Sequence, residues 1–165
     1  MRKLVGVAVV VLLASLGVTA RGAEKTKKAA HGAAANTPQA VFTNYPDAKW
    51  EKIIPALGDD SPEISILHVD PKTKATKLLI RTPTAIHVRK HWHSANETHT
   101  VIIGTPVFAC EGTRIEQVPG SFNYLPAKMV HEAWVPAGGL VFITVDGPWD
   151  VNWVEGPPTG ADLTK

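Results

Sequence analysis

From residue 39 onward, the chain contains no amphipathic segment long enough for a helix and consists instead of short β-rich runs. Residues of turn type separate these runs, as in Asp70-Pro71-Lys72-Thr73. Many short strands at regular spacing are typical of a β-sandwich or a closed β-barrel. We therefore predict an all-β fold. The expected strands are residues 64–69, 77–81, 85–93, 97–103, 106–110, 121–125, 129–135 and 140–145.

The first residues have a different character. Arg2 and Lys3 precede an apolar run over residues 4–18, which ends at Val18-Thr19-Ala20. This pattern predicts a secretory signal peptide over residues 1–20 and export to the periplasm or the extracellular space. We expect cleavage after Ala20, with Gly22 or Ala23 as alternatives. The run is short for a membrane span, which needs about 20 apolar residues, so an uncleaved anchor is the lesser alternative.

Residues 21–38 are rich in Ala and Lys and contain no aromatic residue. Such a segment predicts a disordered linker. Beyond it, residues 39–165 carry 11 Lys and Arg against 14 Asp and Glu, a net charge of −3. A domain of this sign offers no electrostatic basis for binding nucleic acid. We also expect no stable membrane insertion after signal cleavage.

The remaining length is enough for one ordinary core and too short for two. No internal repeat is visible, and we predict one β-barrel domain over residues 39–157 and a flexible tail over 158–165. The chain has a single cysteine, Cys110, far from the cleavage site. A single cysteine cannot form an internal disulfide, so we expect the core or a metal to hold the fold. Because Cys110 is far from the cleavage site, we expect no lipid attachment at that site.

One short segment combines metal-binding side chains. In His91-Trp92-His93, two imidazoles at positions i and i+2 of a strand share one face. Residues 94–96 suit a tight connection, after which Glu97 opens the next expected strand. Two nitrogens and a carboxylate oxygen from adjacent strands form a three-point site that suits Fe, Mn, Ni, Cu or Zn. A solvated polar turn is the alternative interpretation of this spacing alone.

A family resemblance covers residues 76–145. The segment His91-x-His93-x-x-x-Glu97, followed after six residues by Gly104, resembles the first cupin motif. A second group resembles the later cupin motif and consists of Gly120, Pro126, Lys128 and His131. The resemblance implies a single-domain cupin, a small antiparallel β-barrel of jelly-roll type. It also implies that His131 is the fourth ligand of one divalent transition metal ion, beside His91, His93 and Glu97.

The sequence departs from the cupin pattern at three positions, and none of them removes a ligand. Ala85 stands where the family usually has a Gly, Lys128 replaces the second Gly of the later motif, and Val135 replaces an expected Asn. Lys128 falls where the family makes a glycine turn, which leaves the shape of that loop open.

Other residues are candidates for chemistry or substrate contact. His99 shares the face of Glu97 and could be an outer partner of a ligand, a fifth ligand or a proton shuttle; a satisfied histidine at the barrel mouth is the structural alternative. Glu97 and His99 are therefore the candidate catalytic residues, since Glu97 could also leave the metal to act as a base. Candidate pocket walls for a substrate are Phe122, Tyr124 and Phe142.

Strand parity makes predictions for the neighbouring side chains. His87 and Arg89 share the parity of His91 and could line the same interior, where they would attract an anion. A strand end dipping into solvent is the alternative. Trp134 opposes His131 and should pack outside the ligand cavity.

Three functions remain open at this point. The leading hypothesis is an exported metal-binding cupin that is a metal-dependent, dioxygenase-like enzyme acting on a small oxygenated organic molecule. The second is a non-catalytic metal-binding or small-molecule-binding module of the cell envelope, and the third is a sugar or keto-acid isomerase. A metal acquired after export should be Zn, Cu or Ni more often than Fe. A homodimer through strand edges is compatible with an open jelly roll.

Overall fold

Two antiparallel sheets dominate the computed structural model, which describes residues 39–164. The predicted signal peptide and linker lie outside these residues. The strands are β1 (Glu51–Lys52), β2 (Glu63–Val69), β3 (Thr76–Thr82), β4 (Ala85–Trp92), β5 (Glu97–Ile103), β6 (Val107–Cys110), β7 (Thr113–Glu116), β8 (Phe122–Leu125), β9 (His131–Val135), β10 (Gly139–Val145), β11 (Asn152–Trp153) and β12 (Leu163–Thr164). Three short 3-10 helices accompany them: η1 (Tyr45–Asp47), η2 (Pro55–Asp60) and η3 (Gly160–Asp162). The all-β prediction is confirmed.

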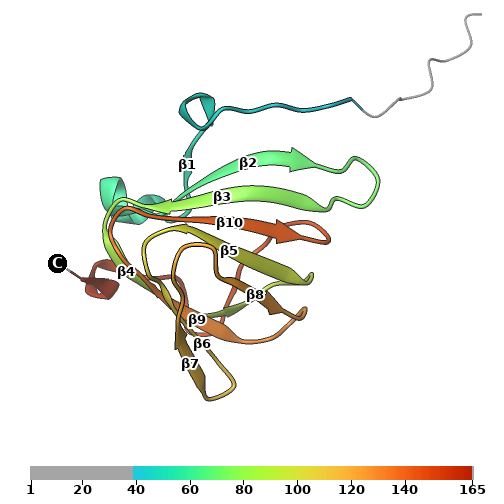
Figure 1. Cartoon of the computed structure of the whole chain (residues 1–165). Coiled ribbons are helices and arrows are strands. Elements are labelled where there is room, and N and C mark those ends of the chain that lie inside the picture. The colour runs from blue at the N-terminus through green and yellow to red at the C-terminus, as the bar shows by residue number, and fades with distance from the viewer. Residues whose placement is uncertain (1–38, 165) are drawn as a thin grey trace, which may run out of the picture. The chain divides into compact units, whose positions relative to one another are not determined.

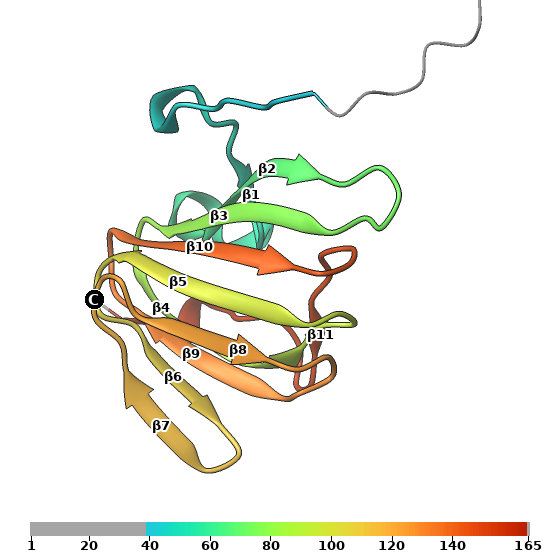
Figure 2. The same cartoon turned by 45° about the vertical axis from the view of Figure 1, so that its right-hand side comes forward.

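The strands are shared between two layers (Figures 1 and 2). The first sheet has the order β1-β2-β3-β10-β5-β8. The second has the order β11-β4-β9-β6-β7, and β12 also pairs with β4. Strands distant in sequence are therefore neighbours, such as β3 and β10, whose residues pair from Thr82 with Gly139 to Thr76 with Val145.

The core lies on the inner face of the first sheet. Alternate residues of a strand point to opposite faces, so Val141, Ile143 and Val145 of β10 all point inward and are buried. They form one apolar cluster with Ile64 of β2 and Leu78 of β3. Burying a side chain of this size stabilises a fold by about 1.5–3 kcal/mol. The same alternation on β5 sends polar side chains into the interior, which positions the site described below.

Eight of the twelve strands match the runs expected from the sequence, with ends that differ by at most two residues. The strands that sequence patterns did not predict are β1, β7, β11 and β12. Each has only two or four residues, which is too short for alternation to be recognised.

Residues 158–164 differ from the flexible tail that we predicted. Pro158 is fully buried, and β12 pairs with β4 through Leu163 and Ile86. The turn η3 begins with a capping box, in which Thr159 and Asp162 satisfy each other's backbone amides. Local capping and strand pairing together hold this segment on the second sheet.

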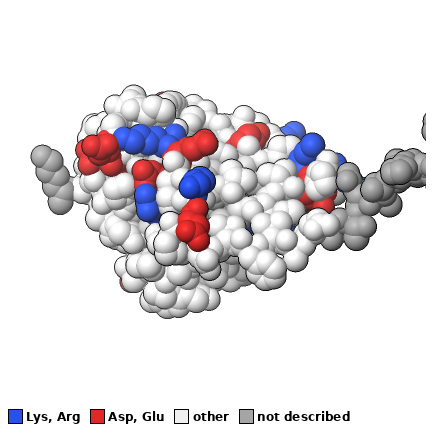
Figure 3. Space-filling model, turned by 90° about the horizontal axis from the view of Figure 1, so that it is seen from above, with Lys and Arg blue, Asp and Glu red and all other residues white. Residues whose placement is uncertain are grey.

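None of the helices in residues 39–164 has the length and apolar character needed to cross a membrane. One face of the molecule, seen in Figure 3, carries Lys and Arg side chains close to Asp and Glu side chains rather than a field of one sign. This mixture agrees with the small negative charge of residues 39–165.

Candidate metal centre

The four predicted ligands come together between the two sheets. His91 lies on β4 and pairs with His131 on β9, His93 follows the end of β4, and Glu97 is the first residue of β5. All four are buried, with exposed fractions of 7% for His91, 5% for His93, 1% for Glu97 and 3% for His131. One nitrogen from each of the three histidines lies within 4.8 Å of the other two.

A bulge in β4 decides which residues of this strand face the interior. Val88 pairs with Ala133, but His91, three residues later, pairs with His131, only two residues away on β9. The additional residue in β4 is a β-bulge, which changes the parity of the strand. Val88 and His91 therefore both line the interior, although simple alternation would put them on opposite faces.

The loop between β4 and β5 is fixed by two aspartates from the chain that follows β10. Asp150 accepts hydrogen bonds from the backbone amide and hydroxyl of Ser94, at 2.9 and 2.6 Å. Asp146 accepts one from the backbone amide of Asn96 at 3.0 Å. Asn96 in turn accepts a hydrogen bond from the backbone amide of Ala127 at 2.9 Å. The residue before Glu97 is thus tied to two other segments, which limits the positions that the carboxylate can take.

Lys128 lies in the loop that leads to His131, and it keeps the glycine-like shape of this turn. Its φ of 66° is in the left-handed region, which residues with a Cβ rarely adopt. Its backbone amide donates a hydrogen bond to the carbonyl of His93 at 2.8 Å. This contact joins the loop before His131 to the segment that carries His93. The loop therefore keeps its shape although lysine stands where the cupin motif has glycine.

Backbone carbonyls orient the three histidines. The Nδ1 atom of His91 donates to the carbonyl of Arg89 at 2.7 Å, and that of His131 donates to the carbonyl of Met129 at 3.0 Å. The Nδ1 atom of His93 donates in the same way to the carbonyl of Asp150. A carbonyl can only accept, so each Nδ1 carries the proton and each neutral ring keeps a lone pair on Nε2. Histidine ligands of metals are held in this way.

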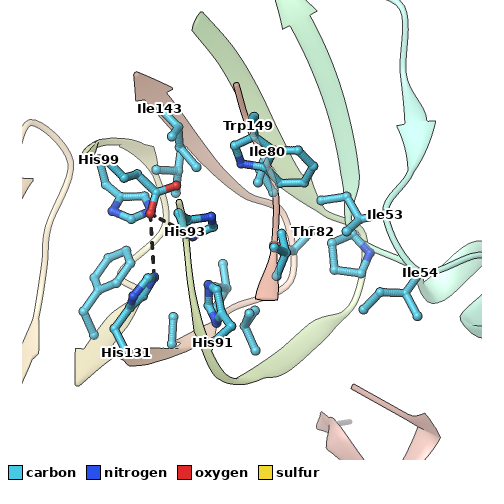
Figure 4. Close-up of a pocket in the computed structure, with 18 of the residues that line it drawn as sticks. Ile53, Ile54, Ile80, Thr82, His91, His93, His99, His131, Ile143 and Trp149 are labelled. Atoms are coloured by element: carbon cyan, nitrogen blue, oxygen red, sulfur yellow. Dashed lines mark ion pairs between the residues drawn. The ribbon is translucent and has the colours of Figure 1, made fainter. Parts of the chain in front are cut away.

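Glu97 lies among three imidazole rings, those of His93, His99 and His131. Its Oε2 atom is 3.0 Å from Nε2 of His93, 3.4 Å from Nε2 of His99 and 3.6 Å from Nε2 of His131. Dashed lines in Figure 4 mark such pairs. Two of these buried atoms, Glu97 Oε2 and His131 Nε2, have no hydrogen-bond partner. A buried polar atom left unsatisfied costs about 1–3 kcal/mol, so the centre is poised for a group that both atoms can bind.

The buried environment shifts the protonation of the ligands. Burial, with the neighbouring His131, lowers the pKa of His91 to about 3, and burial lowers the pKa of His131 to about 4. Burial alone would raise the pKa of Glu97, but the surrounding His99 and His93 outweigh it and lower that pKa to about 2. Burial also opposes the protonation of His93, yet the negative charges of Glu97 and Asp150 raise its pKa. At neutral pH the centre therefore offers one carboxylate and at least two neutral imidazoles.

His99 is a fourth histidine at the centre, and a relay of amides holds it. Its Nδ1 atom lies 2.7 Å from Oδ1 of Asn123. Asn123 Nδ2 donates to Gln117 Oε1 at 3.0 Å, and Gln117 Nε2 donates to the carbonyl of Phe122 at 3.2 Å. Because the last acceptor is a carbonyl, each amide can have only one orientation, and His99 must donate through Nδ1. Its Nε2 atom then faces Glu97.

An apolar cavity of about 90 Å³ extends away from the centre. Figure 4 shows His99 and His131 at one end and Ile53 and Ile54 at the other, with Thr82 and Trp149 between them. Sequence reasoning identified the polar end but not this wall, because its residues come from both sheets and from loops. The apolar lining includes Ile80, Val88, Phe108, Val141, Ile143, Trp149, Val151 and Trp153.

The three aromatic residues that we predicted as pocket walls do not line this cavity. Phe122 and Tyr124 are 61% and 53% exposed on the outer face of β8, and Phe142 points outward from β10. On β8 the inward position opposite His99 belongs to Asn123. The register between β5 and β8, which the sequence does not reveal, determines this parity. Asn123 and Gln117 are the polar residues that sequence reasoning missed.

A second polar group, the outer cluster, lies on the outward face of β4 and β9. It consists of His87, Arg89, Glu132 and Asp162. His87 Nε2 is 2.8 Å from Glu132 Oε2, and Arg89 Nη2 is 2.7 Å from Asp162 Oδ2. Trp134 stacks on His87 with ring centroids 4.5 Å apart, so it lies outside the cavity as parity predicted. Arg89 and His87 therefore do not line the interior.

The residues of the inner cluster (His91, His93, Glu97, His99 and His131) fit a divalent transition metal. Imidazole nitrogen suits Zn, Cu, Fe and Ni, and one carboxylate extends the set toward Fe and Mn. The unpartnered Glu97 Oε2 and His131 Nε2 are acceptors that a cation would satisfy. The fixed Nδ1 protons provide the outer hydrogen bonds that such ligands normally have.

Comparison with known proteins bears on the fold. No protein-family model and no curated protein sequence matches the chain. Among solved structures, an RmlC-like cupin from Shewanella frigidimarina has a TM-score of 0.57 at 16% identity, and the match covers 68% of this chain and 95% of that one. An acetylacetone dioxygenase from Acinetobacter johnsonii has a TM-score of 0.56 at 15% identity, covering 74% of this chain and 82% of that one.

A DMSP lyase, DddQ from Ruegeria pomeroyi, has a TM-score of 0.57 at 14% identity, and the match covers 72% of this chain and 73% of that one. At such identities the likeness establishes the fold alone. The fold is thus a cupin-type antiparallel β-barrel, or jelly roll, as the two motifs predicted.

Proposed function

We propose that this chain is an exported metal-binding cupin and a metal-dependent, dioxygenase-like enzyme for a small oxygenated organic molecule. The observation that carries this proposal is the inner cluster itself. Imidazoles with free Nε2 atoms surround one buried carboxylate, and two of the buried acceptors have no partner. An apolar cavity begins directly at this cluster.

The ligand set that we propose is His91, His93, Glu97 and His131. A divalent ion held there would act as a Lewis acid toward an oxygen of the substrate and could bring O2 beside it. The surrounding side chains would orient the substrate and exclude water. Phe108 and Ile143 of the lining are apolar, and such walls strengthen electrostatic interactions at the ligands.

Glu97 and His99 are the groups that can hold or move a proton. Glu97 Oε2 lies 3.4 Å from His99 Nε2, and both face the cavity. The relay through Asn123 fixes the Nδ1 proton of His99, which leaves Nε2 as the atom that can exchange a proton with a bound substrate. This division of roles is compatible with proton abstraction beside a carbonyl, and thus with oxygenase or isomerase chemistry.

Two further sources support the proposal. The structural neighbours include an acetylacetone dioxygenase and a DMSP lyase, which are enzymes for small organic molecules on the same fold. The fold by itself does not decide the chemistry. Residues 1–20 have the pattern of a signal peptide, and on that basis we place the function in the periplasm or outside the cell.

The test begins with elemental analysis of the mature protein purified from its own compartment. We expect close to one transition metal ion per chain, with Zn, Cu or Ni more often than Fe. Mostly iron-bound protein would refute the expected metal while leaving the site intact. Protein without metal would favour a barrel that binds small molecules without a metal.

A turnover assay with and without O2 then separates the candidate reactions. Metal-loaded protein is mixed with a panel of β-diketones, keto acids and sugars, with and without O2, and substrate loss is followed by chromatography. Loss that requires O2 supports the oxygenase, whereas loss without O2 supports the isomerase. Metal-loaded protein that leaves every compound unchanged while binding some of them supports the non-catalytic module of the cell envelope.

A further inference from the structure

One buried polar atom of the cavity wall is not explained by a metal. In residues 39–164, three buried side-chain nitrogen or oxygen atoms lack a hydrogen-bond partner. Glu97 Oε2 and His131 Nε2 belong to the inner cluster, but the third is the indole Nε1 of Trp149. An indole N–H can only donate, so it cannot bind a cation and needs an acceptor.

The position of Trp149 limits where that acceptor can lie. Its ring packs against the buried cluster of Ile143, Val145 and their neighbours, which holds it in place. Its centroid is 6.5 Å from the imidazole of His93, and Figure 4 shows it along the cavity, between the two ends. A molecule bound at the inner cluster therefore comes within reach of the indole.

The rest of the wall offers almost no other polar partner. Apart from the inner cluster and the two indoles, Thr82 is the one polar side chain in the described lining of the cavity. Its hydroxyl already donates to the carbonyl of Pro136 at 2.7 Å. No Lys or Arg lines the cavity within the described part of the chain. A ligand rich in hydroxyl groups would lose its hydrogen bonds with water there, at a cost of about 1–3 kcal/mol per group.

The net charge of the centre further limits the class of ligand that can bind. A divalent ion with the single carboxylate of Glu97 leaves one net positive charge at the centre, because the histidines bind metals as neutral rings. One negative charge on the ligand neutralises this centre. A second one would be buried without a cation, which is strongly unfavourable.

From these features we propose that the cavity takes a small monoanion with an apolar body, whose carboxylate or enolate oxygen accepts the Trp149 N–H while bound at the inner cluster. This inference rests on the function proposed above and names the class of its substrate. The apolar part lies along Ile80, Val141 and Ile53. The apolar wall excludes sugars and nucleosides, and the charge of the centre excludes dicarboxylates.

Three probes of similar size test the class on protein loaded with Zn²⁺, which is redox-inert. Pentanoate is a monoanion with an apolar body, succinate adds a second charge, and gluconate adds hydroxyl groups. Isothermal titration calorimetry should give pentanoate at least about tenfold tighter binding than either control. Equal or tighter binding of succinate or gluconate would overturn the proposal.

Trp149→Phe tests the role of the indole, because it keeps an aromatic ring but removes the donor. We expect unchanged zinc content and about tenfold weaker binding of pentanoate, the effect of one hydrogen bond to a charged group. Trp134→Phe is the matched control, since Trp134 stacks on His87 outside the cavity. It should change pentanoate binding by less than about threefold. Equal losses of pentanoate affinity in the two variants would refute the role of the Trp149 N–H as a specific donor.

A spectroscopic measurement gives an independent result. In ¹H–¹⁵N spectra of the zinc protein, the indole signal that is missing in Trp149→Phe should move downfield when pentanoate is added. A signal that stays in place would contradict the hydrogen bond. Zinc bound at one ion per chain without pentanoate binding would sink this inference alone, whereas protein that binds no zinc would sink the proposed function with it.

Discussion

The inner and outer clusters both combine histidine with carboxylate and lie on opposite sides of the sheet that contains β4 and β9, yet they differ in how their polar atoms are satisfied. In the outer cluster, His87 pairs with Glu132 and Arg89 pairs with Asp162. In the inner cluster, Glu97 Oε2 and His131 Nε2 have no hydrogen-bond partner and are almost completely buried. The outer cluster is complete by itself, and the inner one needs a ligand.

The two clusters also differ in what they contribute to stability. The partly exposed pairs of the outer cluster are screened by solvent and contribute little to stability, while the pair of Arg89 and Asp162 holds η3 and β12 against β4. The inner cluster instead buries groups that cost free energy unless something binds them. A buried set of donors and acceptors with fixed orientation and missing partners is thus a better sign of function than the presence of histidines and carboxylates.

Acid should give the largest difference between the clusters. The folded pKa values of His91, about 3, and His131, about 4, lie below the unfolded value of 6.5. Each therefore stabilises the fold above pH 6.5, and this contribution is lost as the pH falls toward the folded value. The lowered pKa of Glu97 acts in the same direction between pH 4.5 and about 2.

The raised pKa of His93 acts in the opposite direction, because its contribution is present at low pH and is lost as the pH rises. Two histidines and Glu97 outweigh it, so we expect metal-free protein to lose on the order of 3–5 kcal/mol of unfolding free energy between pH 7 and pH 3. Urea unfolding at a series of pH values measures this. His91→Gln should flatten the curve of unfolding free energy against pH, and His87→Ala should not. An unfolding free energy of the unchanged protein that does not vary with pH would contradict the lowered pKa values of His91 and His131.

Removing one proposed ligand should sharply weaken metal binding. His93→Ala takes away one of the three nitrogens of the candidate centre, and we expect metal affinity to fall by more than about 100-fold. Competition with a chelator of known affinity gives the constant, and elemental analysis gives the stoichiometry. His87→Ala, in the outer cluster, is the control and should keep the full metal content. Full metal in His93→Ala would show that the centre lies elsewhere.

Short-range pattern predicted that His91, His93 and Glu97 lie together. His91 and His93 share a face by strand parity, and Glu97 follows after one tight connection. What the sequence left open or predicted wrongly depended on pairing between distant strands. The bulge before His91 turns Arg89 outward, and the register of β8 against β5 puts Asn123 inside and Phe122 outside. Neither register nor bulges can be derived from local periodicity.

Asn123 is the clearest residue of this second kind, and it provides the next prediction. Asn123→Leu removes the acceptor of the His99 Nδ1 proton, so neutral His99 should populate the other tautomer as well. We expect a loss of about 1–2 kcal/mol in unfolding free energy and retention of metal within about tenfold. Asn123→Asp keeps an acceptor at this position and should preserve the tautomer.

Long-range ¹H–¹⁵N spectra of the histidine side chains distinguish the two tautomers directly. A single Nδ1–H signal for His99 in Asn123→Leu would mean that the amide relay does not orient it. His99→Ala extends the test, since it should leave the metal in place but alter any turnover. Loss of metal in His99→Ala would instead make His99 a ligand.

The smallest expected effect concerns Lys128, which belongs to neither cluster. Its left-handed φ of 66° costs a residue with a Cβ about 1 kcal/mol, whereas glycine adopts it freely. Because glycine loses more backbone entropy on folding, Lys128→Gly should raise the free energy of unfolding by only about 0.5 kcal/mol. The loop shape comes from backbone contacts such as the hydrogen bond to the His93 carbonyl, so metal affinity should not change. A destabilised variant, seen as a lower urea midpoint, would mean that the lysine side chain itself supports the path to His131.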